Sequence, residues 1–281
     1  MGTSLDKKRK RSNVILVLAI ISTLSFGIAF FFNLGDALDY WQDGREAQAQ
    51  TEIMQNIFAE QIEEVVALIA HIAEMPEDDL PPESSPLQDF VGGSLLDEVR
   101  QLTENPDIVA YITIPGTQVG NAVVQGTNNE FYLYHDIFRR PNMNGALFMD
   151  YRNTPDFSNP NTIIYGHNMN NGTKFHNLRF YMQQDFFESH PHILVITAYN
   201  VFIYEVFSTF STRVDFDYIQ VHFYNRDEFG ELIDEINRRA VFETGIIADS
   251  YDRILILSTC TNVREDMRYV VAGRLAHQFE R

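Results

Sequence analysis

From Ile108 to the end of the chain, apolar residues come in short runs rich in Val, Ile, Thr, Phe and Tyr, separated by Gly, Pro and Asn. Runs of this length and composition, bounded by turn-forming residues, are typical of β-strands. Eight segments have the pattern: 108–114, 122–124, 146–150, 162–165, 192–198, 201–210, 253–258 and 268–275. Because these strands are short and follow one another closely, we predict a mainly β fold, a barrel or a sandwich, and not a βαβ fold.

One segment between the sixth and seventh strands has helical spacing instead. Asn225-Arg-Asp-Glu opens the segment, which runs to about Ala240. The apolar residues within it recur on one helical face: Phe229, Leu232, Ile233 and Ile236. The pattern predicts a single helical insertion before the strand that carries the only cysteine.

The N-terminus combines a basic cluster at 7–11 with an apolar run from Val14 to Phe32 that holds no charge. A helix of this length can cross the roughly 30 Å hydrocarbon layer and exceeds the core of a cleaved signal peptide. Basic residues before a span stay cytoplasmic. We therefore predict a cytoplasmic tail at 1–13, a single-pass cell-membrane anchor at 14–32 and an extracellular remainder. A cleaved signal peptide is the alternative, although 35–37 is a poor cleavage site.

Two segments of different composition follow the apolar run. Residues 36–74 carry apolar side chains at helical spacing among Gln and Glu, which predicts one or two amphipathic helices in a stalk or on the flank of a domain. Residues 74–89 are rich in Pro, Asp, Glu and Ser, a composition typical of linkers. We therefore assign 33–93 to a helical stalk and acidic linker and 94–281 to a folded extracellular domain. A fragment that begins near Ser94 should then fold by itself.

Charge and motif content exclude several function classes. The formal net charge is −18, whereas binding to phosphate backbones needs a basic surface, so we expect no nucleic-acid partner. No group of His, Cys, Asp and Glu has the spacing of metal ligands, and no Gly-rich phosphate loop is present. We therefore expect no metal and no cofactor.

Cys260 is the only cysteine, so an exported domain has no internal disulfide, and its thiol is either a buried bystander or a reactive group. It ends the apolar run that starts at Arg253, and a strand end leaves a thiol accessible. Arg268 opens the next predicted strand. If the two strands pair, Arg268 lies at the same end of the sheet as Cys260. A guanidinium there would lower the thiol pKa and hold the oxyanion of a tetrahedral intermediate.

A cysteine nucleophile also needs a group that accepts and returns a proton, and the chain has eight histidines. His167 follows the predicted strand 162–165 and precedes an Asn-rich loop, so it too lies at a strand end. Most of the others lie in polar surroundings, as His190 and His192 do. Position alone leaves His167 as one candidate among several.

Three motifs together resemble the sortase family: Leu257-Ser-Thr-Cys260, the Arg268-Tyr-Val-Val that begins eight residues after the cysteine, and Ile164-Tyr-Gly-His167-Asn-Met. The segments 112–117, 123–125, 129–133 and 172–175, together with the helical insertion, resemble class B sortases in particular. The resemblance covers about Asp107 to Ala276. One departure is Ile256, which stands where the family usually has Thr.

The resemblance implies an eight-stranded β-barrel enzyme on the surface of Gram-positive bacteria, with N-terminal helices. Cys260 would attack the Thr carbonyl of an NPxT-like C-terminal sorting signal of exported proteins and form a thioester. An amine of the peptidoglycan precursor or cross-bridge would then resolve it. By resemblance, His167 shuttles the proton and Arg268 stabilises the oxyanion. The residues matched to the peptide groove are Tyr165, Ser258, Asn129 and Leu133, although each taken singly also fits a barrel-core or strand-end role.

Three other functions are compatible with parts of the sequence. A pilin-polymerising sortase would use a lysine of another protein as acceptor, and the acidic linker at 77–93 could fold over its groove as a lid. A papain-like peptidase is disfavoured, because it places its Cys on a helix upstream of the His. A non-enzymatic surface binding module would carry the cysteine incidentally, and slow alkylation of the thiol at neutral pH would identify it.

Overall fold

The computed structural model describes residues 4–74, 92–169, 171–260 and 267–280. The chain forms two compact units, Met1–Arg45 and Glu46–Arg281, and all of the strands belong to the second. Helix α1 (Ser4–Glu74) is continuous and is followed by α2 (Gly92–Thr103). The shorter helical elements are η2 (Phe131–Leu133), η3 (His176–Met182), α3 (Gln184–Ser189) and α4 (Arg226–Arg239).

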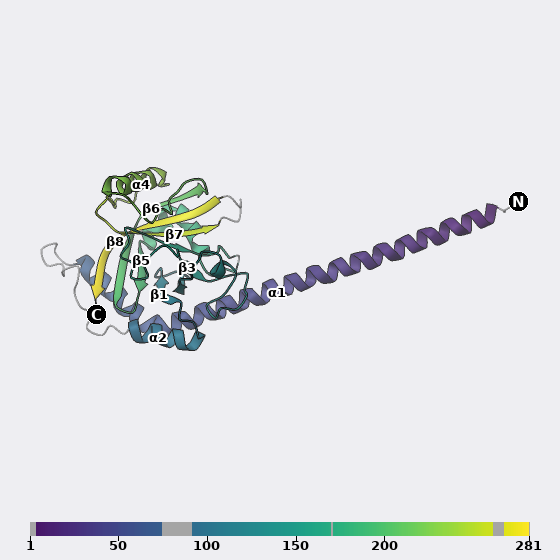
Figure 1. The fold of residues 1–281 in the computed structure, drawn as a ribbon, viewed down its shortest axis with the longest axis horizontal. Helices are drawn as coiled ribbons and strands as arrows, with labels where there is room; N and C mark the ends of the chain where they lie inside the picture. Colours follow the sequence, from purple (N-terminus) through teal and green to yellow (C-terminus); the bar gives the residue numbers. More distant parts are fainter. Residues whose placement is uncertain (1–3, 75–91, 170, 261–266, 281) are drawn as a thin grey trace. The chain divides into compact units, whose positions relative to one another are not determined.

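Eight strands close into a barrel in the order β1-β2-β3-β4-β7-β8-β6-β5, which confirms the predicted fold class (Figure 1). Their bounds are β1 (Ile108–Thr113), β2 (Gly120–Val124), β3 (Leu147–Met149), β4 (Asn161–Tyr165), β5 (His192–Ile196), β6 (Asn200–Arg213), β7 (Ile254–Cys260) and β8 (Met267–Glu280). Neighbours are antiparallel except β2 with β3 and β4 with β7, which are parallel.

Strands β6 and β8 are longer than the sequence pattern predicts. They pair with each other over their whole length, from Asn200 opposite Glu280 to Arg213 opposite Met267, with two register shifts. Polar residues such as Ser211 interrupt the apolar pattern and end the prediction early. The backbone ladder continues through them because a strand needs only one buried face.

β7 has both of its faces buried, which explains its unbroken apolar sequence. Leu255 and Leu257 belong to the core inside the barrel, whereas Ile254 and Ile256 pack in the cluster beneath α4. All four are fully buried. Helix α4 begins as predicted, since the Asn225 side chain accepts a hydrogen bond from the Glu228 N–H at 2.9 Å.

The later part of α1 packs on the barrel, on the side away from α4 in Figure 1. Phe58 is fully buried and stacks on Tyr111 of β1 with ring centroids 4.0 Å apart. Gln50 Nε2 donates to Asp136 at 2.8 Å. From Glu46 onward, the segment assigned to a stalk therefore belongs to the same compact unit as the barrel, and residue 94 lies inside that unit. Helical periodicity shows that one face is apolar but not which surface covers it.

The predicted anchor at 14–32 lies within α1, but nearly all of its side chains fall outside the described residues. The predicted linker at 74–89 lies outside them from residue 75 onward. Among the described residues, no helix has the length and apolar character needed to cross a membrane.

Candidate active site

Parallel pairing of β4 with β7 aligns the two strand ends that carry the predicted nucleophile and base. Tyr165 lies opposite Ser258, and Gly166 N donates to Ser258 O at 3.2 Å. Because parallel strands leave the sheet at the same end, His167 follows β4 at the level where Cys260 ends β7.

The other neighbour of β7 carries the predicted arginine. β8 runs antiparallel to β7, and Arg268 is paired directly with Cys260. Arg268 Nη1 donates to the Met267 carbonyl at 2.9 Å. The side chain of Cys260 and residues 261–266, including Arg264, lie outside the described residues. The backbone nevertheless places Cys260 between β4, which leads to His167, and β8, whose second residue is Arg268.

A cavity of about 440 Å³ opens at this end of the barrel. It is lined by six of the residues singled out from the sequence: Asn129, Leu133, Tyr165, His167, Ser258 and Arg268. Its opposite wall is the segment 214–219, which follows β6. The cavity is therefore a groove of the right size for a short peptide segment, with a base and a guanidinium on its surface.

Burial and hydrogen bonding together set the state of His167. Its Nε2 lies 2.8 Å from the Leu133 carbonyl oxygen. A carbonyl only accepts, so Nε2 carries the proton and Nδ1 holds the lone pair of the neutral ring. Burial lowers the pKa of His167, the hydrogen bond to Leu133 partly opposes this, and the charge of Lys174 adds a smaller lowering. At neutral pH the uncharged imidazole is favoured and can accept a proton through Nδ1.

Lys174 is an unusual neighbour for this histidine because it is only 1% exposed. Burial lowers its pKa to about 8, an effect that the charge of Asp136 opposes. The residue has φ +57°, and its backbone bridges to Asn168. The loop after His167 thus folds back and carries a buried amine into the surroundings of the imidazole.

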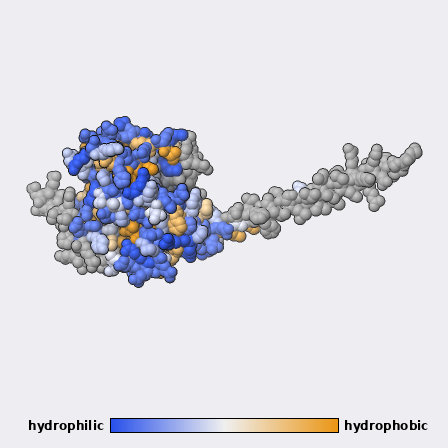
Figure 2. Space-filling view, viewed as in Figure 1, coloured by the Kyte–Doolittle hydropathy of each residue, from blue (hydrophilic) through white to orange (hydrophobic). Residues whose placement is uncertain are grey.

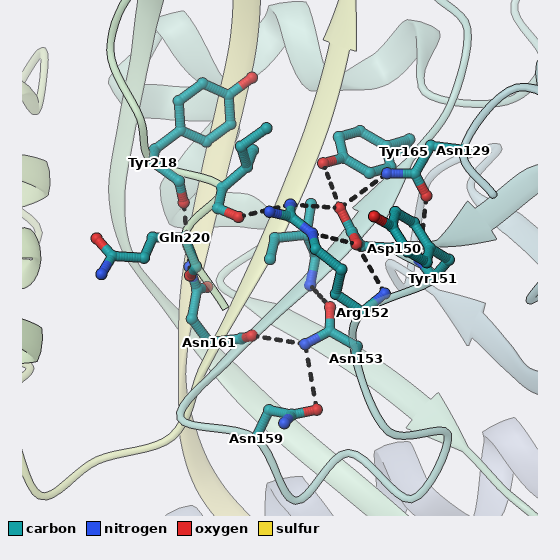
Figure 3. Close-up of polar contacts among 12 residues, drawn as sticks. Asn129, Asp150, Tyr151, Arg152, Asn153, Asn159, Asn161, Tyr165, Tyr218 and Gln220 are labelled. Atoms are coloured by element: carbon teal, nitrogen blue, oxygen red, sulfur yellow. Dashed lines mark hydrogen bonds and ion pairs between the residues drawn. The ribbon is translucent and has the colours of Figure 1, made fainter. Parts of the chain in front are cut away.

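The groove residues on the β4 side are joined by hydrogen bonds (Figure 3). Tyr165 OH and Asn129 Nδ2 each donate to Asp150 Oδ2 at 2.9 Å. On the β7 side, Tyr218 OH and Ser258 Oγ lie 2.7 Å apart. Among the described residues, no three His, Cys, Asp or Glu side chains come close enough to hold a metal ion.

A sortase domain model matches residues 112–276, well over half of the chain. This chain belongs to the sortase family. Sortase B of Listeria monocytogenes serovar 1/2a is 35% identical to it over 188 residues, 66% of this chain and 76% of that protein. The enzyme is therefore a sortase B-type cysteine transpeptidase.

Two solved structures give the same relationship in three dimensions. A Staphylococcus aureus sortase B-substrate complex matches with a TM-score of 0.65 at 26% identity, covering 87% of this chain and 98% of that one. A sortase B complexed with triglycine matches with a TM-score of 0.68 at 28% identity, covering 83% and 98%. The barrel, the N-terminal helices and the inserted helix of this sortase are thus those of the family fold.

Some cavity residues of the sortase were missed in the sequence. The wall at 214–219 contains Phe216 and Tyr218, two aromatic residues between a long strand and a helix, and this aromatic content is the signal that could have indicated it. Asp150 and Lys174 carried no such signal. A charged residue beside a strand or in a loop is usually solvent-exposed, and only the fold shows that both are buried.

Proposed function

We propose that this sortase cleaves an NPxT-like sorting signal of exported proteins after its Thr and transfers the new acyl group to a cell-wall amine. The main support is the pairing of β7 with β4 on one side and β8 on the other, which assembles His167, Cys260 and Arg268 at one end of the barrel. The cavity at that end supports a peptide as the substrate. The substrate complex named for the related S. aureus enzyme supports the same interpretation.

The proposed reaction has two steps, and in each step His167 takes up one proton and gives it back. His167 takes the thiol proton of Cys260 as the sulfur attacks the Thr carbonyl carbon, and the oxyanion that forms is held by the Arg268 guanidinium. The C–N bond then breaks, and His167 gives a proton to the departing amine. In the second step an incoming amine attacks the thioester, His167 takes the amine proton, and the Cys260 sulfur leaves and receives that proton from His167.

The acceptor is proposed by analogy. The relative complexed with triglycine is compatible with a short amine-terminated cross-bridge as acceptor. We also propose that the enzyme works at the outer cell surface behind a membrane anchor at 14–32, on the strength of the basic cluster at 7–11 and the uncharged run that follows it. Deletion of residues 1–32 should then move the protein from the membrane fraction to the soluble fraction of expressing cells.

Mass spectrometry with a peptide library tests substrate and acceptor together. Full-length sortase is mixed with peptides that vary each position of the signal, and with a glycine peptide, a peptidoglycan stem amine or a lysine-bearing protein as acceptor. Cleavage after Thr in NPxT-like peptides and transfer to a cell-wall type amine are expected. Transfer to the protein lysine alone would identify a pilin polymerase, and cleavage at other bonds would refute the motif.

A further inference from the structure

Asp150 lies just after β3, is fully buried, and uses both of its carboxylate oxygens (Figure 3). Oδ1 accepts from Arg152 N at 2.9 Å and from Arg152 Nε at 2.8 Å. Oδ2 accepts from Arg152 Nη2 at 2.8 Å, Tyr165 OH at 2.9 Å and Asn129 Nδ2 at 2.9 Å. One buried carboxylate therefore holds two residues of the groove, although it does not itself line the cavity.

Arg152 extends this network to the opposite wall. Its Nη2 also donates to the Ile219 carbonyl at 2.9 Å. Asn161 Nδ2 supports the same wall by donating to the carbonyls of Tyr218 at 3.0 Å and Gln220 at 2.8 Å. The segment 214–219 is thus fastened at its far end to the β3 and β4 side, and the Asp150–Arg152 ion pair joins the two walls of the groove.

The direction of each hydrogen bond follows from the charge on Asp150. Burial raises the pKa of Asp150, but hydrogen bonds from Arg152, Asn129 and Tyr165 outweigh burial and hold it below its usual range. An ionised carboxylate only accepts, so Tyr165 OH and Asn129 Nδ2 must donate to it. Tyr151 N donates to Asn129 Oδ1 at 3.0 Å and thereby fixes the amide orientation. The Tyr165 hydroxyl, with its proton committed, can only accept from a bound molecule.

We propose that Asp150 and Arg152 are a positioning pair that sets the spacing of the two groove walls and turns Tyr165 into a hydrogen-bond acceptor for the bound peptide. The proposal rests on the proposed function of the cavity as the peptide groove. It assigns to the groove a ligand that offers an N–H to Tyr165, as a peptide amide or a side-chain amide does. The pair acts on substrate binding and leaves the reactivity of Cys260 unchanged.

The decisive variants are Asp150→Asn, Tyr165→Phe and their combination in the full-length chain. Asp150→Asn keeps the shape but can donate toward the tyrosine, which removes the fixed direction of that bond. Glu205→Gln is the matched control, because Glu205 pairs with Arg274 at 2.8 Å between β6 and β8 and lines no part of the groove. Three experiments are carried out: steady-state cleavage of a signal peptide for kcat and KM, Cys260 alkylation without peptide, and amide hydrogen exchange.

Asp150→Asn should raise KM at least about tenfold, the size expected for one lost hydrogen bond to a charged group, with kcat within about threefold. Cys260 alkylation should match wild type. The KM of the double variant should be no higher than that of the worse single variant, since both substitutions remove the same contact with the peptide. Hydrogen exchange should accelerate at 128–133 and 214–220 in Asp150→Asn and remain unchanged in Glu205→Gln.

The proposal would be overturned if the effects of the two single substitutions on KM were additive in the double variant. It would also be overturned if Asp150→Asn lowered kcat and the rate of Cys260 alkylation at unchanged KM, or if hydrogen exchange in both wall segments stayed as in wild type. If Asp150→Asn does not fold, Arg152→Lys serves instead, because an ammonium cannot reach both Asp150 oxygens and the Ile219 carbonyl as a fork does. Arg152→Lys should also raise KM with kcat nearly unchanged, by a smaller factor than Asp150→Asn. A wild-type KM in Arg152→Lys would contradict the pairing. A wild-type enzyme that cleaves no signal peptide refutes the proposed function, while the exchange experiment, which needs no peptide, still decides the role of the pair.

Discussion

His167 shares its surroundings with a buried ammonium group, and this neighbour predicts how the imidazole titrates. The pKa of His167 should lie below its usual 6.5, because burial and Lys174 both disfavour the charged ring. Lys174→Met removes one of these effects and should raise the pKa. Histidine NMR titration of wild type and variant measures it, with Arg238→Gln on the exposed face of α4 as the control. A pKa that falls or stays constant in Lys174→Met would contradict the account.

Lys174 also predicts a pH dependence of stability. Its folded-state pKa of about 8 lies below the ordinary 10.5, so the folded state binds fewer protons than the unfolded state between these values. Stability of the wild type should therefore rise with pH through that window. Lys174→Met should be more stable at pH 7, by up to roughly 3 kcal/mol for a shift of this size, and should lose the advantage by about pH 10.5. Urea unfolding at pH 7 and pH 10 measures the difference in free energy of unfolding between Lys174→Met and wild type. An equal difference at both pH values would refute the prediction.

Arg268 and Arg264 give a matched pair for testing the oxyanion role. Arg268 is paired with Cys260 in the β7–β8 ladder and is fixed through the Met267 carbonyl, so it offers a rigid donor. Arg268→Ala should lower kcat by about 10²–10³, the usual loss for one oxyanion donor. Arg268→Lys should recover only part of it, because the planar fork is lost. Steady-state peptide cleavage should show Arg264→Ala within a few-fold of wild type; the reverse order would reassign the role.

At the scale of elements, α1 is the test of where the domain begins. A fragment starting at Glu46 keeps the buried contacts of Met54, Phe58 and Val65, whereas one starting at Ser94 uncovers the outer face of β1. We expect the first to unfold cooperatively and the second to aggregate or melt far lower. Phe58→Ala in the full chain should cost about 3–5 kcal/mol, as for other buried aromatic residues. Equal thermal stability of the two fragments would show that α1 is dispensable.

The elements also show what sequence reasoning could reach. Eight strands and α4 were predictable because local alternation, turn residues and the Asn225 cap report on local structure. The adjacency of β4 and β7 was not, because parallel pairing of strands far apart in sequence leaves no local pattern. For the same reason the burial of Asp150 and Lys174 could not be predicted, since burial of a charge depends on partners from distant segments. His167, Cys260 and Arg268 could be proposed together from the sequence because the family resemblance supplied that non-local information.

For the whole molecule, the face drawn in Figure 2 is mostly hydrophilic over the barrel-bearing unit, with hydrophobic patches that are small and separate. This agrees with a formal net charge of −18, which keeps a protein soluble but does not identify a partner. We therefore expect the proposed peptide substrate to be recognised in the groove at the end of the barrel. The charge that we expect to matter for catalysis is local: the guanidinium of Arg268, and the imidazolium that forms when His167 takes a proton.

The central claim is that Cys260 carries the substrate as a thioester, and intact-mass spectrometry followed by peptide mapping tests it most directly. Full-length wild type, Cys260→Ala and His167→Ala are each mixed with a peptide that contains an NPxT-like signal, without an acceptor amine. The account predicts that wild type gains the mass of the fragment ending at Thr, that the adduct maps to Cys260, and that Cys260→Ala neither gains mass nor cleaves. His167→Ala should keep an alkylatable thiol yet turn over negligibly. Measurable turnover by Cys260→Ala, or an adduct on any other residue, would contradict the covalent mechanism outright.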